Sequence, residues 1–190
     1  MVKIIPKNHP DAVKEACNVL YDDGIIVYPT DTIYGFGCNA KSEAAINKLN
    51  SLKKRKGPMS VLCPNIETAL EWMNLPDLQK LASKKRLGGK NTVIVPVKDN
   101  IVSSIILGKN GTLGIRIPQN DFCANISKKY PNPITTTSVN QTGFDPHIDP
   151  TEINKEFKHN IDLLIDHGII NGKGSKIHLL EKGIWKVLRK

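Results

Sequence analysis

Apolar residues recur at helical spacing in several stretches of the chain. In the segment Pro10–Tyr21 a proline and an aspartate stand where a helix would begin, and the apolar residues that follow fall on one helical face. Those residues are Val13, Ala16, Cys17 and Leu20. By the same reasoning, helices are predicted over Glu43–Leu52 (capped by Ser42), Glu67–Met73, Pro76–Lys84, Asp121–Lys129 and Thr151–Phe157.

Short runs rich in apolar or β-branched residues lie between these segments and are typical of strands. The predicted strands are Ile25–Tyr28, Ser60–Cys63, Thr92–Val97, Leu113–Ile117, Ile134–Thr137, Asp162–Ile165, Ile177–Leu180 and Trp185–Leu188. Strands that alternate with helices indicate an α/β domain with a partly parallel sheet. A chain of 190 residues is long enough for one hydrophobic core but short for two, so a single domain over residues 1–190 is expected.

Polar residues follow three of the predicted strands where each strand ends. The first runs into Tyr28-Pro29-Thr30-Asp31-Thr32-Ile33-Tyr34-Gly35-Phe36-Gly37, a turn of hydroxyls, one carboxylate and two glycines. The other two end in Ile115-Arg116-Ile117-Pro118 and in Ile134-Thr135-Thr136-Thr137-Ser138-Val139-Asn140. Strand ends are the usual place for a ligand site in a sheet protein, so these segments are predicted to form one polar cleft.

The composition narrows the function classes. No apolar stretch approaches the roughly 18 residues of a membrane span, and the N-terminal residues do not form a signal peptide, so a cytoplasmic protein is expected. The four cysteines form no C-x-x-C pair and have no histidine at zinc-ligand spacing, which favours reduced thiols over disulfides or a metal site. A net charge of +9 favours polyanionic partners such as nucleoside triphosphates or RNA, although a lysine-rich solvated surface gives the same number.

Two basic features are candidates for anion binding. The run Lys53-Lys54-Arg55-Lys56-Gly57-Pro58 is either a solvated helix end, favoured by the helix dipole, or a rigid cationic corner for phosphate or carbonate oxygens. Arg116 lies in an apolar strand, where a charge is costly unless paired, so it either forms an internal ion pair or clamps a carboxylate ligand. Ser138 and Asn140 are ligand candidates, although turns use the same residue types.

Motifs of several common reaction mechanisms are missing from the sequence. It contains no Ser-His-Asp order, no H-E-x-x-H helix and no Walker loop, and its five histidines are spread out. Strand ends that are polar but poor in acid–base groups favour catalysis by positioning and charge neutralisation.

Several motifs together resemble the YrdC-like family of L-threonylcarbamoyladenylate synthases, in its short, single-domain form. They are Tyr28–Gly35, Leu52–Arg55, Gly114–Arg116 and Thr137–Gly143, in the family's order and spacing. Ser175 and Arg189 fit the family's C-terminal strand pair, so the resemblance covers nearly the whole chain. The family's W-P-G-P-x-T reads Leu87-Gly88-Gly89-Lys90-Asn91-Thr92 here, and the loop after Arg55 is shorter than in the family.

The resemblance implies a YrdC/RibB-like fold: a twisted mixed parallel and antiparallel sheet with flanking helices around a deep basic cleft. It also implies a reaction in which L-threonine, bicarbonate and ATP, accompanied by Mg²⁺, give threonylcarbamoyl-AMP and pyrophosphate. A separate transferase complex would then pass the threonylcarbamoyl group to adenosine in tRNA, with direct tRNA contact by this chain as a further expectation.

The resemblance assigns roles to individual positions of this chain. The residues that would bind L-threonine are Thr32, Arg116, Thr136 and Ser175, with Arg116 on the carboxylate. Those that would bind ATP are Arg55, Thr112, Ser138, Asn140 and Arg189. Lys53 and Arg55 are the catalytic candidates, with Lys53 near the phosphates, and no residue is assigned to a metal ion.

Two alternatives share this fold. A non-enzymatic RNA-binding protein would use the basic cleft on tRNA or structured rRNA, which the net charge permits. A carbamoyl-transfer domain like that of hydrogenase maturation proteins would be accompanied by C-x-x-C zinc motifs, and this sequence has none. Threonine-dependent release of pyrophosphate separates the enzyme from the RNA-binding protein.

Overall fold

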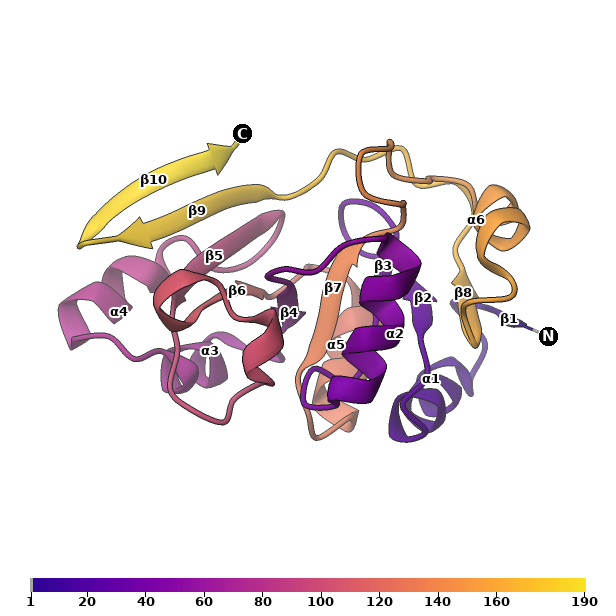
Figure 1. The fold of residues 1–190 in the computed structure, drawn as a ribbon, viewed down its shortest axis with the longest axis horizontal. Coiled ribbons are helices and arrows are strands. Elements are labelled where there is room, and N and C mark those ends of the chain that lie inside the picture. The colour runs from indigo at the N-terminus through magenta and orange to yellow at the C-terminus, as the bar shows by residue number, and fades with distance from the viewer. Residues whose placement is uncertain (1) are drawn as a thin grey trace.

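A mixed sheet of ten strands forms the centre of the molecule, in a computed structural model that describes residues 2–190. The strand order is β1-β8-β2-β3-β7-β4-β6-β5-β9-β10. Figure 1 shows the sheet running across the molecule, from β1 near the N-terminus to the β9–β10 hairpin at the C-terminus. Because this order departs from the chain order, segments far apart in the sequence become neighbours.

The strands are β1 (Lys3–Pro6), β2 (Ile26–Tyr28), β3 (Gly35–Gly37), β4 (Ser60–Leu62), β5 (Asn91–Pro96), β6 (Thr112–Arg116), β7 (Ile134–Ser138), β8 (Leu163–Asp166), β9 (Lys176–Glu181) and β10 (Ile184–Arg189). The helices are α1 (Ala12–Tyr21), α2 (Glu43–Lys53), α3 (Ile66–Trp72), α4 (Asp77–Lys84), α5 (Asp121–Lys129) and α6 (Pro150–Phe157). Two short 3₁₀ turns, η1 (Ser104–Ile106) and η2 (Lys109–Gly111), precede β6. Each helix predicted from the sequence is present, with boundaries shifted by up to two residues.

Both strand directions occur in the sheet, as the resemblance implies. β1, β8 and β2 are parallel neighbours, as are β4 with β6 and β5 with β9. The remaining pairs are antiparallel, including β3 with β7 and β7 with β4 in the middle of the sheet. Their register sets Gly35 opposite Ser138 and Ser60 opposite Thr136, so polar residues of β4 and β7 lie side by side, next to β3.

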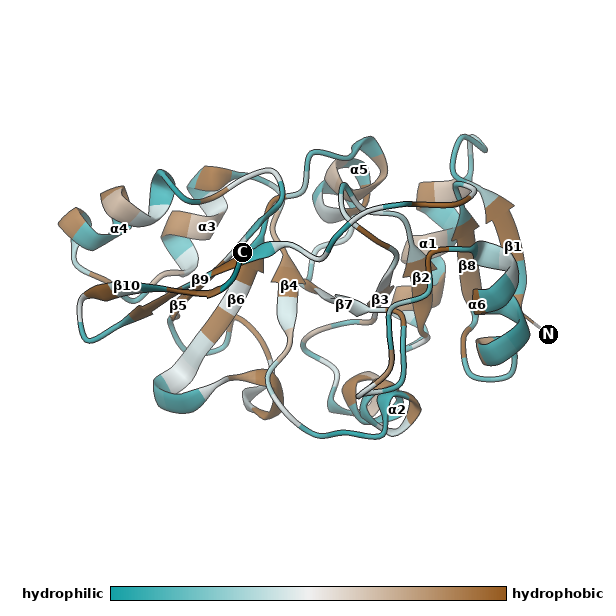
Figure 2. Ribbon diagram, turned by 90° about the horizontal axis from the view of Figure 1, so that it is seen from above, coloured by the Kyte–Doolittle hydropathy of each residue, from teal (hydrophilic) through white to brown (hydrophobic). Residues whose placement is uncertain are grey.

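Helices cover both faces of the sheet because several strands are apolar on both sides. In β2, Ile26 and Tyr28 pack with α1 and α5, whereas Val27 faces the opposite core with α2, α3 and α6. All three side chains are fully buried, which explains why this strand reads as a continuous apolar run in the sequence. In Figure 2 strands such as β2 and β8 are largely hydrophobic, whereas α6 and many loops carry hydrophilic positions.

Two strands, β1 and β3, are absent from the sequence prediction. Gly35 and Gly37 were predicted to lie in a turn, and that prediction is wrong, because both lie in β3, antiparallel to β2. Gly37 is needed for packing, because a Cβ at this position would lie 2.7 Å from the Tyr28 ring and 3.0 Å from Ile134. Glycine in a strand allows this close approach of a large side chain.

All four cysteines are free and buried, and burial raises the pKa of the Cys38 and Cys63 thiols to about 12, which leaves them protonated and unreactive. None of the described helices is long and apolar enough to cross a membrane.

Candidate functional site

The three polar strand ends predicted from the sequence line one cavity of about 250 Å³. They are joined there by the turn after α2 and by the two C-terminal strands. The lining consists of Thr30, Thr32, Ile33, Tyr34, Gly35, Arg55, Pro58, Met59, Ser60, Thr92, Arg116, Thr136, Thr137, Ser138, Gly174, Ser175, Ile177 and Arg189. The prediction that these segments meet in one polar cleft is therefore confirmed.

Seven of the ten candidate site residues line this cavity: Thr32, Arg55, Arg116, Thr136, Ser138, Ser175 and Arg189. Lys53 and Asn140 lie behind the lining and contact each other. Thr112, at the start of β6, is outside the lining, and its hydroxyl donates to the Lys109 carbonyl oxygen. Their roles toward a ligand, like those of the seven, stay predictions.

The basic run after α2 divides its side chains between solvent and the cavity. Lys54 ends the helix in the left-handed conformation, with φ 53°, and is exposed, as is Lys56. Arg55 between them turns into the cavity lining, where its Nε is buried without a hydrogen-bond partner among the described residues. Thus part of the run is a solvated helix end and Arg55 is available to an anion.

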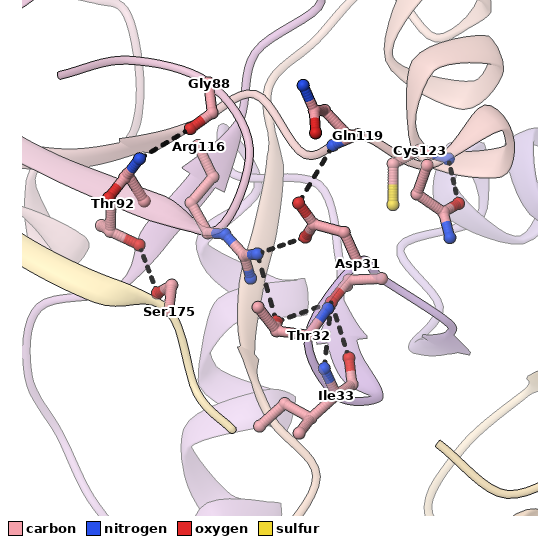
Figure 3. Close-up of polar contacts among 12 residues, drawn as sticks. Asp31, Thr32, Ile33, Gly88, Thr92, Arg116, Gln119, Cys123 and Ser175 are labelled. Carbon is pink, nitrogen blue, oxygen red and sulfur yellow. Dashed lines mark hydrogen bonds and ion pairs between the residues drawn. The ribbon is translucent and has the colours of Figure 1, made fainter. Parts of the chain in front are cut away.

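Arg116 satisfies both interpretations drawn from the sequence, because it forms an internal ion pair and also lines the cavity. Its Nη2 donates to Asp31 Oδ1 at 2.7 Å and to Thr32 Oγ1 at 3.2 Å (Figure 3). The side chains of Arg116 and Asp31 are only 8% and 7% exposed. The ion pair makes a buried cation tolerable, while Nε has no partner among the described residues.

The hydrogen-bond donor and acceptor roles of the hydroxyls beside Arg116 are fixed. Thr30 Oγ1 donates to the Ile33 carbonyl oxygen at 2.7 Å, so in its 2.9 Å contact with Thr32 Oγ1 it is Thr32 that donates. Thr32 Oγ1 therefore faces the cavity as an acceptor. It can receive a hydrogen bond from a ligand ammonium or hydroxyl group, but its own proton is already used.

A second polar cluster comes from the C-terminal strands. Arg189 donates from Nε to the Ser175 carbonyl oxygen at 2.7 Å and from Nη2 to Ser175 Oγ at 3.2 Å. Ser175 Oγ also lies 2.7 Å from Thr92 Oγ1, as Figure 3 shows. A register shift in the β9–β10 pair between Val187 and Arg189 marks a bulge just before this arginine, and bulges commonly redirect side chains next to sites.

The cavity is suited to anions. Three arginines and several hydroxyls line it, and among the described lining residues there is no carboxylate, histidine or lysine. Such a lining can neutralise the charge of phosphate and carboxylate groups and hold them close together. Proton transfer by a side chain is not what this arrangement favours.

Some lining residues were not among the candidates chosen from the sequence. Thr30, Ser60 and Gly174 line the cavity, and Asp31 stands directly behind Arg116. Asp31 and Thr30 belong to the polar turn already singled out, so that turn held the signal for them. Ser60 and Gly174 carry no local signal, because only the strand order brings them to the cavity.

The comparison with protein families identifies the fold family. The model of the Sua5/YciO/YrdC family, which carries the description "Telomere recombination", matches residues 18–190. The chain belongs to this family. The resemblance seen in the sequence is thereby confirmed.

Individual members of the Sua5/YciO/YrdC family match over most of the chain. The threonylcarbamoyl-AMP synthase of Psychromonas ingrahamii is 29% identical over 184 residues, which are 93% of this chain and 95% of that protein. The structure of E. coli YciO has a TM-score of 0.90 at 23% identity and covers 100% of this chain and 96% of its own. P. abyssi Sua5, solved in complex with L-threonine, has a TM-score of 0.87 at 21% identity.

The match to Sua5 covers 100% of this chain but 57% of the Sua5 chain, so this chain spans little more than half the length of that relative. At identities below 25% these structural similarities show the shared fold of the family. They do not by themselves transfer a ligand to this chain.

In this family member Lys53 supports the site from behind. It is 2% exposed, and its Nζ donates to the carbonyl oxygens of Ser138 and Asn140 at 2.6 and 2.8 Å and to Asn140 Oδ1 at 3.1 Å. All three ammonium hydrogens are thus used within the chain. Lys53 fixes the segment that follows β7, and through it the position of Ser138 in the lining.

Lys53 is expected to make stability depend on pH above neutrality. Burial, together with the Arg55 charge, lowers the pKa of Lys53 to about 8 from its usual 10.5. Between these values the unfolded chain binds more protons than the folded chain, so the free energy of unfolding should rise with pH in that window. Thermal unfolding of the wild type and of Lys53→Met from pH 7 to 10.5 measures this. The wild type should gain stability relative to the variant above about pH 8; a constant difference would contradict the assignment.

Gly174 is expected to control Arg189. A Cβ at this position would lie 2.9 Å from Arg189 Cζ, the far end of a flexible side chain, so Gly174→Ala should displace the guanidinium from Ser175 with little loss of stability. If Arg189 contacts ATP, the KM for ATP should rise about tenfold in Gly174→Ala, the effect of one lost charge-assisted contact. Arg189→Ala should raise it by a similar factor, and the double variant no further. Additive effects in the double variant would show that the two residues act independently.

Proposed function

We propose that the chain is a threonylcarbamoyl-AMP synthase, which condenses L-threonine, bicarbonate and ATP to threonylcarbamoyl-AMP and pyrophosphate. The observation that carries the proposal is that residues from distant family motifs, among them Thr32, Arg55, Arg116 and Ser138, line one cavity. The P. ingrahamii relative of that name, matched over 93% of this chain, supports the same activity.

The roles of the lining residues follow from their chemistry. Arg116 would pair with the carboxylate of L-threonine, and Thr32 would accept from its ammonium or hydroxyl group, with Thr136 and Ser175 completing that part of the cavity. Arg55, Ser138 and Arg189 would bind ATP, and Lys53 and Asn140 would support the phosphate side from behind. Thr112 is proposed as an ATP contact on the strength of the family motif.

The reaction needs charges brought together more than it needs a strong base. The threonine nitrogen attacks bicarbonate to give a carbamate with loss of water, and a carbamate oxygen then attacks the α-phosphorus as pyrophosphate leaves. Both steps unite anions, and the arginines of the lining would offset their repulsion. Enclosing the carbamate would protect it from water.

The remaining parts of the proposal concern the surroundings of the reaction. Mg²⁺ would enter with the triphosphate, since the lining offers arginines and hydroxyls, which are poor ligands for it. We propose that the cleft is deep and basic, that residues 1–190 act as one domain in the cytoplasm, and that the product serves tRNA modification through a separate transferase complex. Direct contact with tRNA is compatible with the +9 charge.

Pyrophosphate release tests the proposed function. The chain is incubated with L-threonine, bicarbonate and MgATP, and each component is omitted in turn. Release that requires all three, with formation of threonylcarbamoyl-AMP, supports the enzyme. Salt-sensitive RNA binding without threonine-dependent release would favour the RNA-binding protein instead.

A further inference from the structure

The guanidinium of Arg116 has five hydrogens, and only two of them are used within the chain. Both belong to Nη2: one is accepted by Asp31 Oδ1 at 2.7 Å and the other by Thr32 Oγ1 at 3.2 Å. Nε is buried without a partner, and no described residue accepts from Nη1. Arg116 is therefore held at a single nitrogen.

This arrangement limits how a carboxylate ligand can bind. Two edges of a guanidinium can pair with both oxygens of a carboxylate, and each edge needs one hydrogen of Nη2. A ligand that pairs with two nitrogens must therefore take the place of either Asp31 or Thr32. The Thr32 contact is longer and involves a neutral group, so it is the weaker one.

Asp31 is itself held in place from the other side. Its Oδ2 accepts from the backbone N–H of Gln119 at 3.0 Å, so the carboxylate links the turn after β2 to the turn after β6 (Figure 3). With 7% of its side chain exposed, Asp31 has little freedom to turn away. It lies beside the cavity lining and is not part of it.

We propose that Asp31 is a positioning residue for L-threonine: it keeps one Nη2 hydrogen of Arg116 and fixes the guanidinium plane, while Thr32 yields the other Nη2 hydrogen to the ligand carboxylate. The released Thr32 oxygen then has a lone pair for the ligand ammonium or hydroxyl group. This inference rests on the proposed function. It adds Asp31 to the same site and says which of the two Nη2 contacts, that of Thr32, gives way to the ligand.

The direction in which Asp31→Asn changes the KM for L-threonine separates a positioning role from a purely electrostatic one. Removing a negative charge beside the cavity would by itself strengthen the binding of an anion. Loss of positioning has the opposite effect, because the asparagine side chain has one acceptor oxygen and cannot serve both Arg116 and the Gln119 N–H. We expect Asp31→Asn to raise the KM for L-threonine about tenfold, within the range of coupled neighbouring residues, with the KM for ATP unchanged.

The experiment compares the full chain with Asp31→Asn, Arg116→Ala and the double variant, by threonine-dependent pyrophosphate release and thermal unfolding. In the double variant the kcat/KM for threonine should be no lower than in Arg116→Ala, since Asp31 acts only through Arg116. The matched control is Asp162→Asn, whose carboxylate accepts from the Ile25 N–H at 2.8 Å outside the cavity lining. This control should keep both wild-type KM values.

The outcomes are distinguishable from failure of the proposed function. If the wild type shows no threonine-dependent release, the proposed function is wrong and this inference with it. If the wild type is active but the KM for threonine of Asp31→Asn is equal to or lower than that of the wild type, only the positioning role is overturned. The same holds if the KM for ATP of Asp31→Asn rises as much as its KM for threonine. Should Asp31→Asn be unfolded at the assay temperature, the test uses Asp31→Glu, which keeps the charge but shifts it. This variant must then show a raised KM for threonine and an unchanged KM for ATP.

Discussion

Replacing Arg116 by alanine is expected to raise the KM for L-threonine by about 10- to 150-fold, the equivalent of one bidentate charge-assisted contact of roughly 1.5–3 kcal/mol. The KM for ATP should change much less. The reason is that Arg116 carries the free donors nearest the Thr32 turn, whereas the other two arginines lie on the turn after α2 and on β10. Steady-state pyrophosphate release at varied threonine and varied ATP measures both constants.

Arg55→Ala is the matched control for Arg116→Ala, because it removes the same charge from the same cavity. It should damage the use of ATP more than that of threonine. Equal losses for both ligands in Arg116→Ala would reject its role as a carboxylate clamp. A lower melting temperature of Arg116→Ala is expected in addition, since Asp31 would lose its buried partner.

Gly172→Ala is expected to disable the site through the backbone. A Cβ on Gly172 would lie 1.6 Å from the carbonyl oxygen of Thr32 and 2.7 Å from its carbonyl carbon, so one of the two backbone segments must move. Overpacking of this kind costs about 1–3 kcal/mol, and the displaced Thr32 faces the proposed threonine site. We expect a lower melting temperature and at least a tenfold loss of kcat/KM for threonine, a loss of about 1.4 kcal/mol or more in transition-state stabilisation.

Asn171→Ala is the control for Gly172→Ala, because Asn171 is the exposed neighbour in the same segment. It should retain the stability and the threonine kinetics of the wild type. If Gly172→Ala behaved like Asn171→Ala, the close crossing of this segment over Thr32 would not hold in solution.

The fold was only partly predictable from the sequence, because some elements depend on contacts between distant segments, as at Gly172. The apolar residues of β2 and β6, the β-branched residues of β7 and the one-sided spacing in α1 and α2 are local signals, so these elements were found. β3 was missed because it contains two glycines, of which Gly37 is required by the ring of Tyr28 on the neighbouring strand. Such a requirement depends on tertiary contacts and leaves no local pattern.

The candidate site was likewise predictable only where a local sequence signal exists. Thr32, Arg116 and Ser138 were found because each is a polar or charged residue in a segment where a predicted strand ends. Lys53 was chosen from the same basic run as Arg55, yet one is buried against backbone oxygens and the other lines the cavity. The helix end decides between them, since Lys54 in the left-handed conformation turns the chain just after Lys53.

The position of bound ligands tests the account most directly. A crystal structure of the chain with L-threonine and a non-hydrolysable ATP analogue should show the threonine carboxylate on Arg116, with Asp31 still on Nη2, and the phosphates beside Arg55 and Arg189. Threonine bound elsewhere, or phosphates on Arg116, would contradict the account.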